Sequence, residues 1–349
     1  MSAVTRLDAP EFPGLVLRVH PGGTAVAERM APLANAVNTA EGVEELVTVE
    51  ELQNWLGYPT AAFDPARDVV LAEIDGALAG YAWVDWVETT DGLLEFRFGG
   101  YVHPDWQGRG IGRRLLAWQE AHAREAPAAQ ATDRPVVFGT WAPDERARKR
   151  RLFERAGYEP IRYFFEMQRS DLDRVDVPPL PEGIEVRPLG RDRASERQLW
   201  DADVEAFADH WGGFDASDAA FERMLAAPEH DPDLWIVAWD GEEIAGAVTN
   251  AIFAAENEAY GRRQGWLATV FVRRPWRRRG LGAAIVARAL VRLREAGMSE
   301  AALGVDSDNP SGALARQSKR RSTRDMARGP EALSRSLGSE SESRAMRIN

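Results

Sequence analysis

The sequence predicts a mixed α/β fold that occurs twice in tandem. Two glycine loops carry this prediction, because residues 107–112 read QGRGIG and residues 277–282 read RRRGLG. In both places an apolar run ending at Val102 or Val272 leads into the loop, and an amphipathic helical run leaves it. A strand that delivers backbone amides to the start of a helix can bind a phosphate or pyrophosphate. The repeat therefore predicts two similar halves, each with one anion-binding loop.

The elements around the two loops follow the same order. Each half opens with a short strand and a long helical region, continues with an apolar strand closed by an Asp-Gly hairpin turn, and has one more strand after the loop helix. The matched segments are 15–19 and 184–187 (first strands), 69–74 and 234–239 (apolar strands), Asp75-Gly76 and Asp240-Gly241 (turns), and 136–141 and 301–306 (last strands). A strand over 163–168 closes the first half alone. We predict a first domain over 15–170, a proline-rich linker over 171–183 and a second domain over 184–314.

The helices that follow the loops have apolar side chains at helical spacing. In the first half these are Ile111, Leu115 and Trp118, and in the second they are Leu281, Ile285, Val286, Leu290 and Leu293. One face of each helix should therefore pack on the sheet.

Composition excludes several classes of protein. The chain has 349 residues, a formal net charge of -12 and a sequence pI near 5.1, which argues against a nucleic acid or membrane partner. It has no cysteine, and its five histidines have no metal-ligand spacing, so no metal is expected. No apolar run approaches the length of a membrane span or of a signal-peptide core. These features predict a cytoplasmic protein, as a monomer or homodimer.

The glycine loops and their flanks resemble the GCN5-related N-acetyltransferase superfamily in tandem form, with a layout similar to that of mycothiol synthase. The resemblance lies in residues 102–112 and 272–282 and in the closing segment 152–158 of the first half. It implies two tandem acyl-CoA N-acyltransferase domains, each a central mixed sheet flanked by helices, with the second truncated. It also implies acetyl-CoA as co-substrate, with direct transfer of acetyl to a primary amine of a small molecule. A dinucleotide loop and a P-loop fit the spacing less well.

The resemblance places acetyl-CoA on the end of the strand and on the loop in each half. The implied binding residues are Tyr101, Val102, His103, Gln107, Gly108, Arg109, Gly110, Ile111, Gly112 and Arg113 in the first half, and Phe271, Val272, Arg277, Arg278, Arg279, Gly280, Leu281, Gly282 and Asn309 in the second. Glycines let backbone N–H groups approach phosphate oxygens, and arginines add charge-assisted hydrogen bonds. The same pattern also fits a tight strand-to-helix turn with solvated arginines.

The residues expected to perform acid and base chemistry are incomplete. Where the family often has an acidic base on the strand before the loop, this chain has Phe96 and Trp266. Glu95 is the candidate base, provided that a β-bulge turns it toward the cleft; a solvent-facing strand glutamate is the alternative. His103 can titrate near neutral pH, although a structural role before Pro104 is favoured. Phe153 occupies the place of the family's frequent tyrosine acid.

Acceptor binding is expected in the helical regions after the first strand of each half. Glu44, Glu45, Glu50 and Glu51 in the first half suit a cationic amine, and a solvated helix face explains them equally well. Tryptophans such as Trp55, Trp83 and Trp235 either line the acceptor cleft or pack in the core, and core packing is favoured.

After Leu314 the sequence changes character, and no aromatic residue follows Trp276. Residues 315–349 are interpreted as a disordered appendage, an arginine-rich binding tail, or an aberrant end created by a frameshift, which is favoured. In that case the second half lacks its closing strands and exposes a sheet edge.

The first half, with its complete fold, is the better candidate for acetyl-CoA, although in mycothiol synthase the second half carries catalysis. The alternative function is a catalytically inactive acetyl-CoA-binding or scaffold protein.

Overall fold

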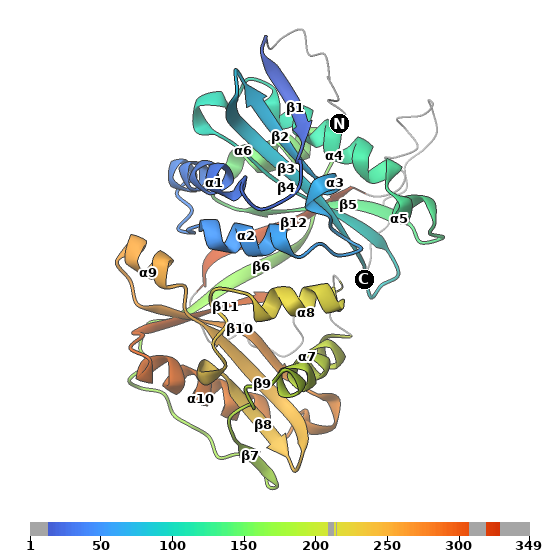
Figure 1. Ribbon diagram of the computed structural model, residues 1–349. Helices are drawn as coiled ribbons and strands as arrows, with labels where there is room; N and C mark the ends of the chain where they lie inside the picture. The colour runs from blue at the N-terminus through green and yellow to red at the C-terminus, as the bar shows by residue number, and fades with distance from the viewer. Residues whose placement is uncertain (1–12, 209–212, 214, 307–318, 329–349) are drawn as a thin grey trace.

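The computed structural model describes residues 13–208, 213, 215–306 and 319–328, and within the last range only the side chain of Met326 (Figure 1). The elements alternate as the duplication predicts. The first half contains β1 (Leu15–Val19), α1 (Ala27–Glu41), α2 (Val49–Gly57), α3 (Pro65–Asp68), β2 (Val69–Ile74), β3 (Ala77–Glu88), β4 (Leu94–Val102), α4 (Ile111–Glu125), α5 (Pro127–Gln130), β5 (Val136–Pro143), α6 (Ala147–Arg155) and β6 (Glu159–Arg169).

The second half repeats this order. It contains β7 (Ile184–Val186), α7 (Arg193–Phe207), α8 (Asp218–Leu225), β8 (Ile236–Asp240), β9 (Glu243–Ala251), α9 (Ala254–Tyr260), β10 (Gln264–Val272), α10 (Leu281–Glu295) and β11 (Glu300–Asp306), and β12 (Lys319–Arg328) follows. Short 3-10 helices precede both loops, at Pro104–Trp106 and Arg274–Trp276, and a third lies at Pro232–Leu234. The mixed α/β class and the tandem arrangement are confirmed.

The two halves share one continuous twelve-stranded sheet in the order β1-β2-β3-β4-β5-β12-β6-β11-β10-β9-β8-β7. Figure 1 shows the first half above and the second below, with β6, β11 and β12 where they meet. β6 leaves the first half and pairs antiparallel with β11, with Met167 opposite Leu303. β12 enters between β5 and β6, with Thr323 opposite Pro143 on one side and Phe164 on the other.

The pairing of β6 with β11, and of β12 with β5 and β6, corrects two expectations about the end of the chain. The second half does not expose an edge at β11, because β6 covers it. Residues 319–328 form a strand, although they are poor in large apolar side chains, because both of its edges are paired and Met326 is buried in the first-half core. Residues 307–318 and 329–349 lie outside the described part of the chain.

Period-two alternation places helices on both faces of the first-half sheet. Val69 and Leu71 of β2 pack with α1 and α2, whereas Val70 and Ala72 pack with Ile111 and Leu115 of α4. In the second half, Leu281, Ile285 and Leu293 of α10 pack on the sheet in the same way. The predicted apolar faces of both loop helices therefore lie in the core.

The predicted Asp75-Gly76 turn joins β2 to β3. In the second half the hairpin is also present, but Asp240 still belongs to β8 and pairs with Glu243, so the turn to β9 consists of Gly241 and Glu242. Asp75 and Gly76 both have positive φ angles, of 50° and 83°, as the twist of a tight two-residue hairpin requires. Residues 171–183 contain no helix or strand, but Leu172 is buried in the second-half core. The segment predicted as a linker is therefore partly packed.

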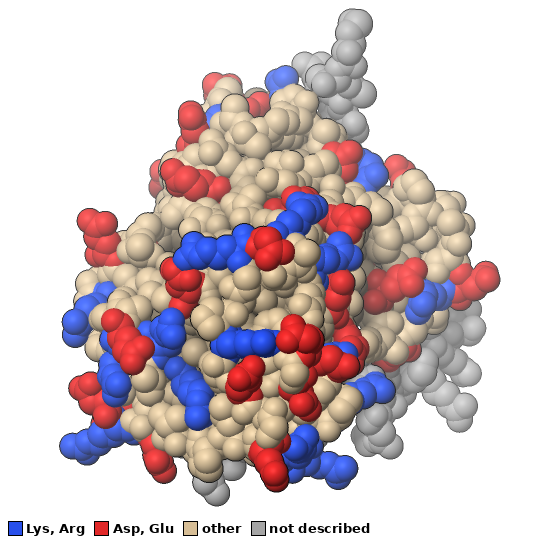
Figure 2. All heavy atoms as spheres, turned by 60° about the horizontal axis from the view of Figure 1, so that its bottom comes forward, with Lys and Arg blue, Asp and Glu red and all other residues tan. Residues whose placement is uncertain are grey.

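Viewed from the side of the second half, basic and acidic side chains are interspersed (Figure 2). On α7, for example, Arg193 pairs with Glu222, and Arg197 pairs with Asp201 at 2.8 Å and with Asp218 at 2.6 Å. Among the described helices, none is both long and apolar enough to cross a membrane.

Candidate functional site

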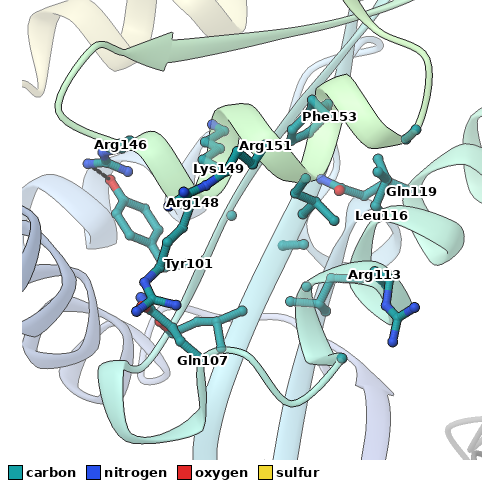
Figure 3. A pocket seen from close by; sticks show the side chains of 18 of the residues that line it. Tyr101, Gln107, Arg113, Leu116, Gln119, Arg146, Arg148, Lys149, Arg151 and Phe153 are labelled. Carbon is teal, nitrogen blue, oxygen red and sulfur yellow. Dashed lines mark hydrogen bonds between the residues drawn. The ribbon is translucent and has the colours of Figure 1, made fainter.

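A cavity of about 950 Å³ opens in the first half where β4 and β5 separate. The two strands pair in parallel from Leu94↔Val136 to Arg97↔Gly139. Beyond this point β4 continues to Val102 and β5 to Pro143 without pairing with each other. Helices α4 and α6 border the opening, which we call the first-half cavity (Figure 3).

The predicted glycine loop forms one end of this cavity. Gly108 and Gly110 have φ angles of 76° and 91°, and Gly110 caps α4 without a side-chain hydrogen bond. The first amides of α4 thus have no side-chain cap, which suits an anionic ligand. Gln107 donates from Nε2 to the carbonyl of Val102 at 3.1 Å and so fixes the loop against the end of β4.

The structure brings seven of the ten first-half binding candidates to the cavity wall. They are Tyr101, Val102, Gln107, Gly108, Gly110, Gly112 and Arg113. The other three lie around it: Ile111 is buried in the core, Arg109 stacks on the Trp106 ring at 4.9 Å, and His103 accepts from the Asp105 amide at 3.3 Å. The contact of His103 agrees with the favoured structural role.

Sequence reasoning missed the cationic wall opposite the loop. Arg146, Arg148, Lys149, Arg151 and Arg155 line the cavity from α6 and its N-cap. Arg146, Arg148 and Lys149 lie at the N-terminal end of α6. Cations there oppose the helix dipole, so an anion bound beside them would be stabilising. The signal in the sequence was the basic run at residues 146–151, which reads RARKRR.

Arg146 links this wall to β4. It is buried, donates from Nη2 to Asn38 Oδ1 at 2.6 Å and to the Tyr101 hydroxyl at 3.4 Å, and lies 4.7 Å above the Tyr101 ring. Burial raises the pKa of Tyr101, and Arg146 opposes that rise only in part. The Tyr101 hydroxyl therefore stays protonated at neutral pH.

Gln119 of α4 is a second polar group that the sequence did not reveal. Its Nε2 donates to the carbonyls of Trp83 and Gly99, at 2.8 and 2.7 Å. Trp83 packs directly on Gly99, since a Cβ at Gly99 would come within 1.9 Å of its ring. These contacts fix the segment of β4 that has no β5 partner.

A second cavity, of about 550 Å³, lies between the two halves on the other side of Tyr101. We call it the inter-half cavity. Its wall combines aromatic and acidic side chains from both halves: Trp55, Tyr81, Trp83, Tyr101, Glu45 and Glu51 from the first, and Phe253, Trp266 and Glu256 from the second. Aromatic faces and carboxylates together favour an organic cation. Tyr101 lines both cavities.

Hydrogen bonds between the halves hold this cavity together. Glu256 accepts from the Leu46 amide at 3.2 Å, and the Tyr260 hydroxyl donates to the Glu45 carbonyl at 3.3 Å. The predicted acidic residues Glu45 and Glu51 therefore lie beside an aromatic cavity. Trp55 and Trp83 line that cavity, whereas Trp235 is buried in the second-half core.

Glu95, the candidate base, lines neither of these two cavities. It is 4% exposed and accepts from Arg97 Nε at 3.0 Å. The bulge expected in β4 is absent from its pairing with β3, which runs without interruption from Gly80↔Val102 to Glu88↔Leu94. A register shift occurs instead in the second half, between Leu267 and Thr269 of β10. The catalytic role of Glu95 stays a prediction.

The second loop repeats the geometry of the first. Gly280 caps α10 with a φ angle of 86° and no side-chain hydrogen bond, and β10 and β11 stop pairing after Trp266↔Ala302. Its arginines contact neighbouring backbone: Arg277 donates to the carbonyls of Val272 and Ala206, at 2.9 and 3.1 Å, and Arg279 donates to that of Glu182 at 3.3 Å.

The remaining second-half candidates lie in and around this loop. Phe271 and Leu281 are buried, Val272 packs against the core, and Gly282 lies in the first turn of α10. Arg278 has a positive φ angle of 61°. Asn309 lies outside the described residues. Within the described residues, no group of three or more His, Asp or Glu side chains is placed to hold a metal ion.

Comparison with known protein families finds an acetyltransferase (GNAT) model in each half. The acetyltransferase (GNAT) domain model matches residues 65–160, and the acetyltransferase (GNAT) family model matches residues 197–316. A mycothiol acetyltransferase of Geodermatophilus obscurus is 31% identical over 298 residues, which cover 84% of this chain and 88% of that protein. A mycothiol acetyltransferase of Thermobispora bispora is 30% identical over 81% of this chain and 88% of its own length.

Solved structures agree with the tandem layout. A GCN5-related N-acetyltransferase from Sphaerobacter thermophilus superposes with a TM-score of 0.63 at 27% identity, covering 91% of this chain and 96% of that chain. A tandem GNAT protein from the clavulanic acid biosynthesis pathway superposes with a TM-score of 0.62 at 16% identity, covering 90% and 98%. The second likeness concerns the fold alone.

Proposed function

Because the chain belongs to the GCN5-related N-acetyltransferase family, we propose that it transfers acetyl directly from acetyl-CoA to a primary amine of a small molecule. Acetyl-CoA occupies the first-half cavity, and the amine enters the inter-half cavity. The observation that carries this proposal is that Tyr101 lines both cavities, so that a cation-lined space and an acid-and-aromatic-lined space meet at one residue.

The charges that line the two cavities support placing acetyl-CoA in the first-half cavity and the amine in the inter-half cavity. The first-half cavity is lined by six basic residues, Arg113, Arg146, Arg148, Lys149, Arg151 and Arg155, against the acidic Glu41 and Glu120. This balance suits the phosphates of coenzyme A, with the pyrophosphate at the start of α4. The three carboxylates of the inter-half cavity suit an ammonium group.

Direct transfer needs the amine nitrogen to reach the thioester carbonyl while donors stabilise the developing oxyanion. The stretch of β4 after Arg97 supplies backbone amides that β5 does not use. The Tyr101 hydroxyl, held by Arg146, is a further donor at the same place. Glu95 remains the proposed base, and its exchange for Gln tests that role through the pH dependence of kcat.

The second candidate function is a non-catalytic acetyl-CoA-binding protein. It is favoured by Phe96, Trp266 and Phe153, which have no ionisable group at the positions where the family resemblance leads one to expect a base or an acid. Release of the free thiol of coenzyme A in the presence of amines separates the two. Release above background supports the enzyme, whereas tight binding without release supports the binding protein.

The experiment that tests the proposed site is titration calorimetry of acetyl-CoA with a matched pair of variants, Gly110→Glu and Gly280→Glu. Both glycines cap the loop helix with positive φ, so the two substitutions impose the same strain and the same negative charge. We expect Gly110→Glu to abolish binding and Gly280→Glu to leave the first-half site occupied. Loss of binding in Gly280→Glu alone would contradict the assignment to the first half.

A further inference from the structure

The chain has 43 basic residues, and only two of them, Lys149 and Lys319, are lysines. Lys149 lines the first-half cavity. Arginine and lysine differ chemically, because a guanidinium stays charged in proteins whereas an amine can lose its proton and become a nucleophile. One of the two lysine side chains thus lines the cavity in which we place acetyl-CoA.

Lys149 lies on α6 between Arg146 and Phe153 (Figure 3). Its Nζ is 6.0 Å from the centre of the Phe153 ring. Within the described residues it has no ion pair and no hydrogen bond, in contrast to Arg146 and Arg150, which both have carboxylate partners. No carboxylate of the described structure therefore holds the amine in its charged form by direct contact.

The charges around Lys149 also disfavour its charged form. Burial lowers its pKa to about 7, Arg146 adds to this effect, and Glu41 of α1 and Glu45 oppose it. The other charged side chains of the cavity are Arg148, Arg151 and Arg155 of α6 and Arg113 and Glu120 of α4. An exposed lysine is almost entirely charged at neutral pH, whereas the lowered pKa of Lys149 gives it a much larger neutral fraction.

We propose that Lys149 is a self-acetylation site. When acetyl-CoA occupies the first-half cavity and no amine occupies the inter-half cavity, the neutral Nζ attacks the thioester carbon. The new bond is the amide C–N bond, the C–S bond breaks, and the proton lost from nitrogen leaves with coenzyme A as the free thiol. No further reactant is required. The inference rests on the proposed position of acetyl-CoA.

Acetylation would change the cavity permanently, because an amide does not pass its acetyl group on to an amine under these conditions. The side chain would lose its charge and extend further into the space beside Phe153 and Arg146. We therefore expect the acetylated protein to bind acetyl-CoA more weakly, by about tenfold for the loss of one charge-assisted contact. Self-acetylation would then limit activity when the acceptor is absent.

The experiment is incubation of the purified full chain with acetyl-CoA, without amine, followed by intact mass and peptide mapping. We expect one acetyl group on Lys149, with a rate that saturates with acetyl-CoA and levels off above about pH 8. Lys319 in the same sample is the internal control, and we expect it to react at least about tenfold more slowly. Lys149→Arg removes the amine and keeps a cation in the cavity, so it should abolish the modification at residue 149, while Lys319 reacts as in the parent chain.

One further variant and calorimetry of the parent chain separate the outcomes. If Gly110→Glu acetylates Lys149 as fast as the parent chain, the acetyl group comes from solution and the inference is overturned. If the parent chain binds acetyl-CoA by calorimetry but leaves Lys149 unmodified, the inference is overturned while the proposed function stands. If the parent chain does not bind acetyl-CoA, the proposed function fails, and the inference fails with it.

Discussion

Arg278 and Gly108 occupy the same place in the two glycine loops, and their backbones are alike. Arg278 has a φ angle of 61° and Gly108 one of 76°. A left-handed backbone strains a residue with a Cβ, whereas glycine adopts it freely. We expect Arg278→Gly to raise the free energy of unfolding by about 0.5–1 kcal/mol, the strain being partly offset by the greater freedom of glycine in the unfolded chain.

In urea unfolding we expect a higher midpoint concentration, while the dependence of the unfolding free energy on urea concentration stays the same. Arg279→Gly is the matched control, because it removes the same charge one residue later, where the φ angle is not positive. The control should lower the midpoint. A lower urea midpoint in both variants would contradict this expectation. It would show that the contacts of the Arg278 side chain stabilise the fold by more than the strain of its left-handed backbone destabilises it.

Asp203 of α7 makes stability depend on pH. Burial raises its pKa to about 7, and its Oδ1 has no hydrogen-bond partner within the described structure. The unfolded chain releases this proton near pH 4, so the folded state holds more protons between about pH 4 and pH 7, and stability falls as pH rises through that window.

Asp203→Asn removes this titration and keeps the shape of the protonated side chain. We expect the variant to be more stable than the parent at pH 8, by about 1–3 kcal/mol, and equally stable near pH 4. Urea unfolding of both proteins at the two pH values measures the difference. An equal difference at pH 8 and pH 4 would contradict a role for the Asp203 charge.

At the scale of elements, β6 and β12 mark the limit of what the sequence predicts. The strands, loop helices and hairpin turns of each half are predicted by local periodicity and turn chemistry, and β1 and β2 match their predicted ranges. Which strand closes which half depends on pairing between segments far apart in the chain, and periodicity carries no information about it. β12 illustrates the difficulty, because its pairing relies on backbone groups that every residue has.

The candidate site shows the same limit. Gly108, Gly110 and Gln107 were predicted because their roles depend on local backbone geometry. Arg146 donates a hydrogen bond to Tyr101, and Gln119 donates one to the carbonyl of Gly99. Both partners lie on β4, a different element, so only the tertiary fold brings these residues together. Glu95 was predicted with a bulge in β4, and the regular pairing of β3 with β4 leaves it outside both cavities. The cationic wall of α6 was readable as a basic run at a helix start, where such residues oppose the dipole.

At the scale of the whole molecule, the inter-half cavity makes the acceptor site depend on the second half even when acetyl-CoA binds to the first. Trp266 lines this cavity from β10 and does not line the first-half cavity. We expect Trp266→Ala to raise the KM for the amine about tenfold, through loss of a cation–π and packing surface, and to leave the acetyl-CoA affinity unchanged. Steady-state kinetics with an accepted amine, together with calorimetry of acetyl-CoA, measure the two effects separately.

Trp141→Ala is the control, since Trp141 is exposed and lines neither cavity. An unchanged amine KM in Trp266→Ala would mean that the second half does not contribute to acceptor binding, and the acceptor would then have to reach Tyr101 from the first half alone.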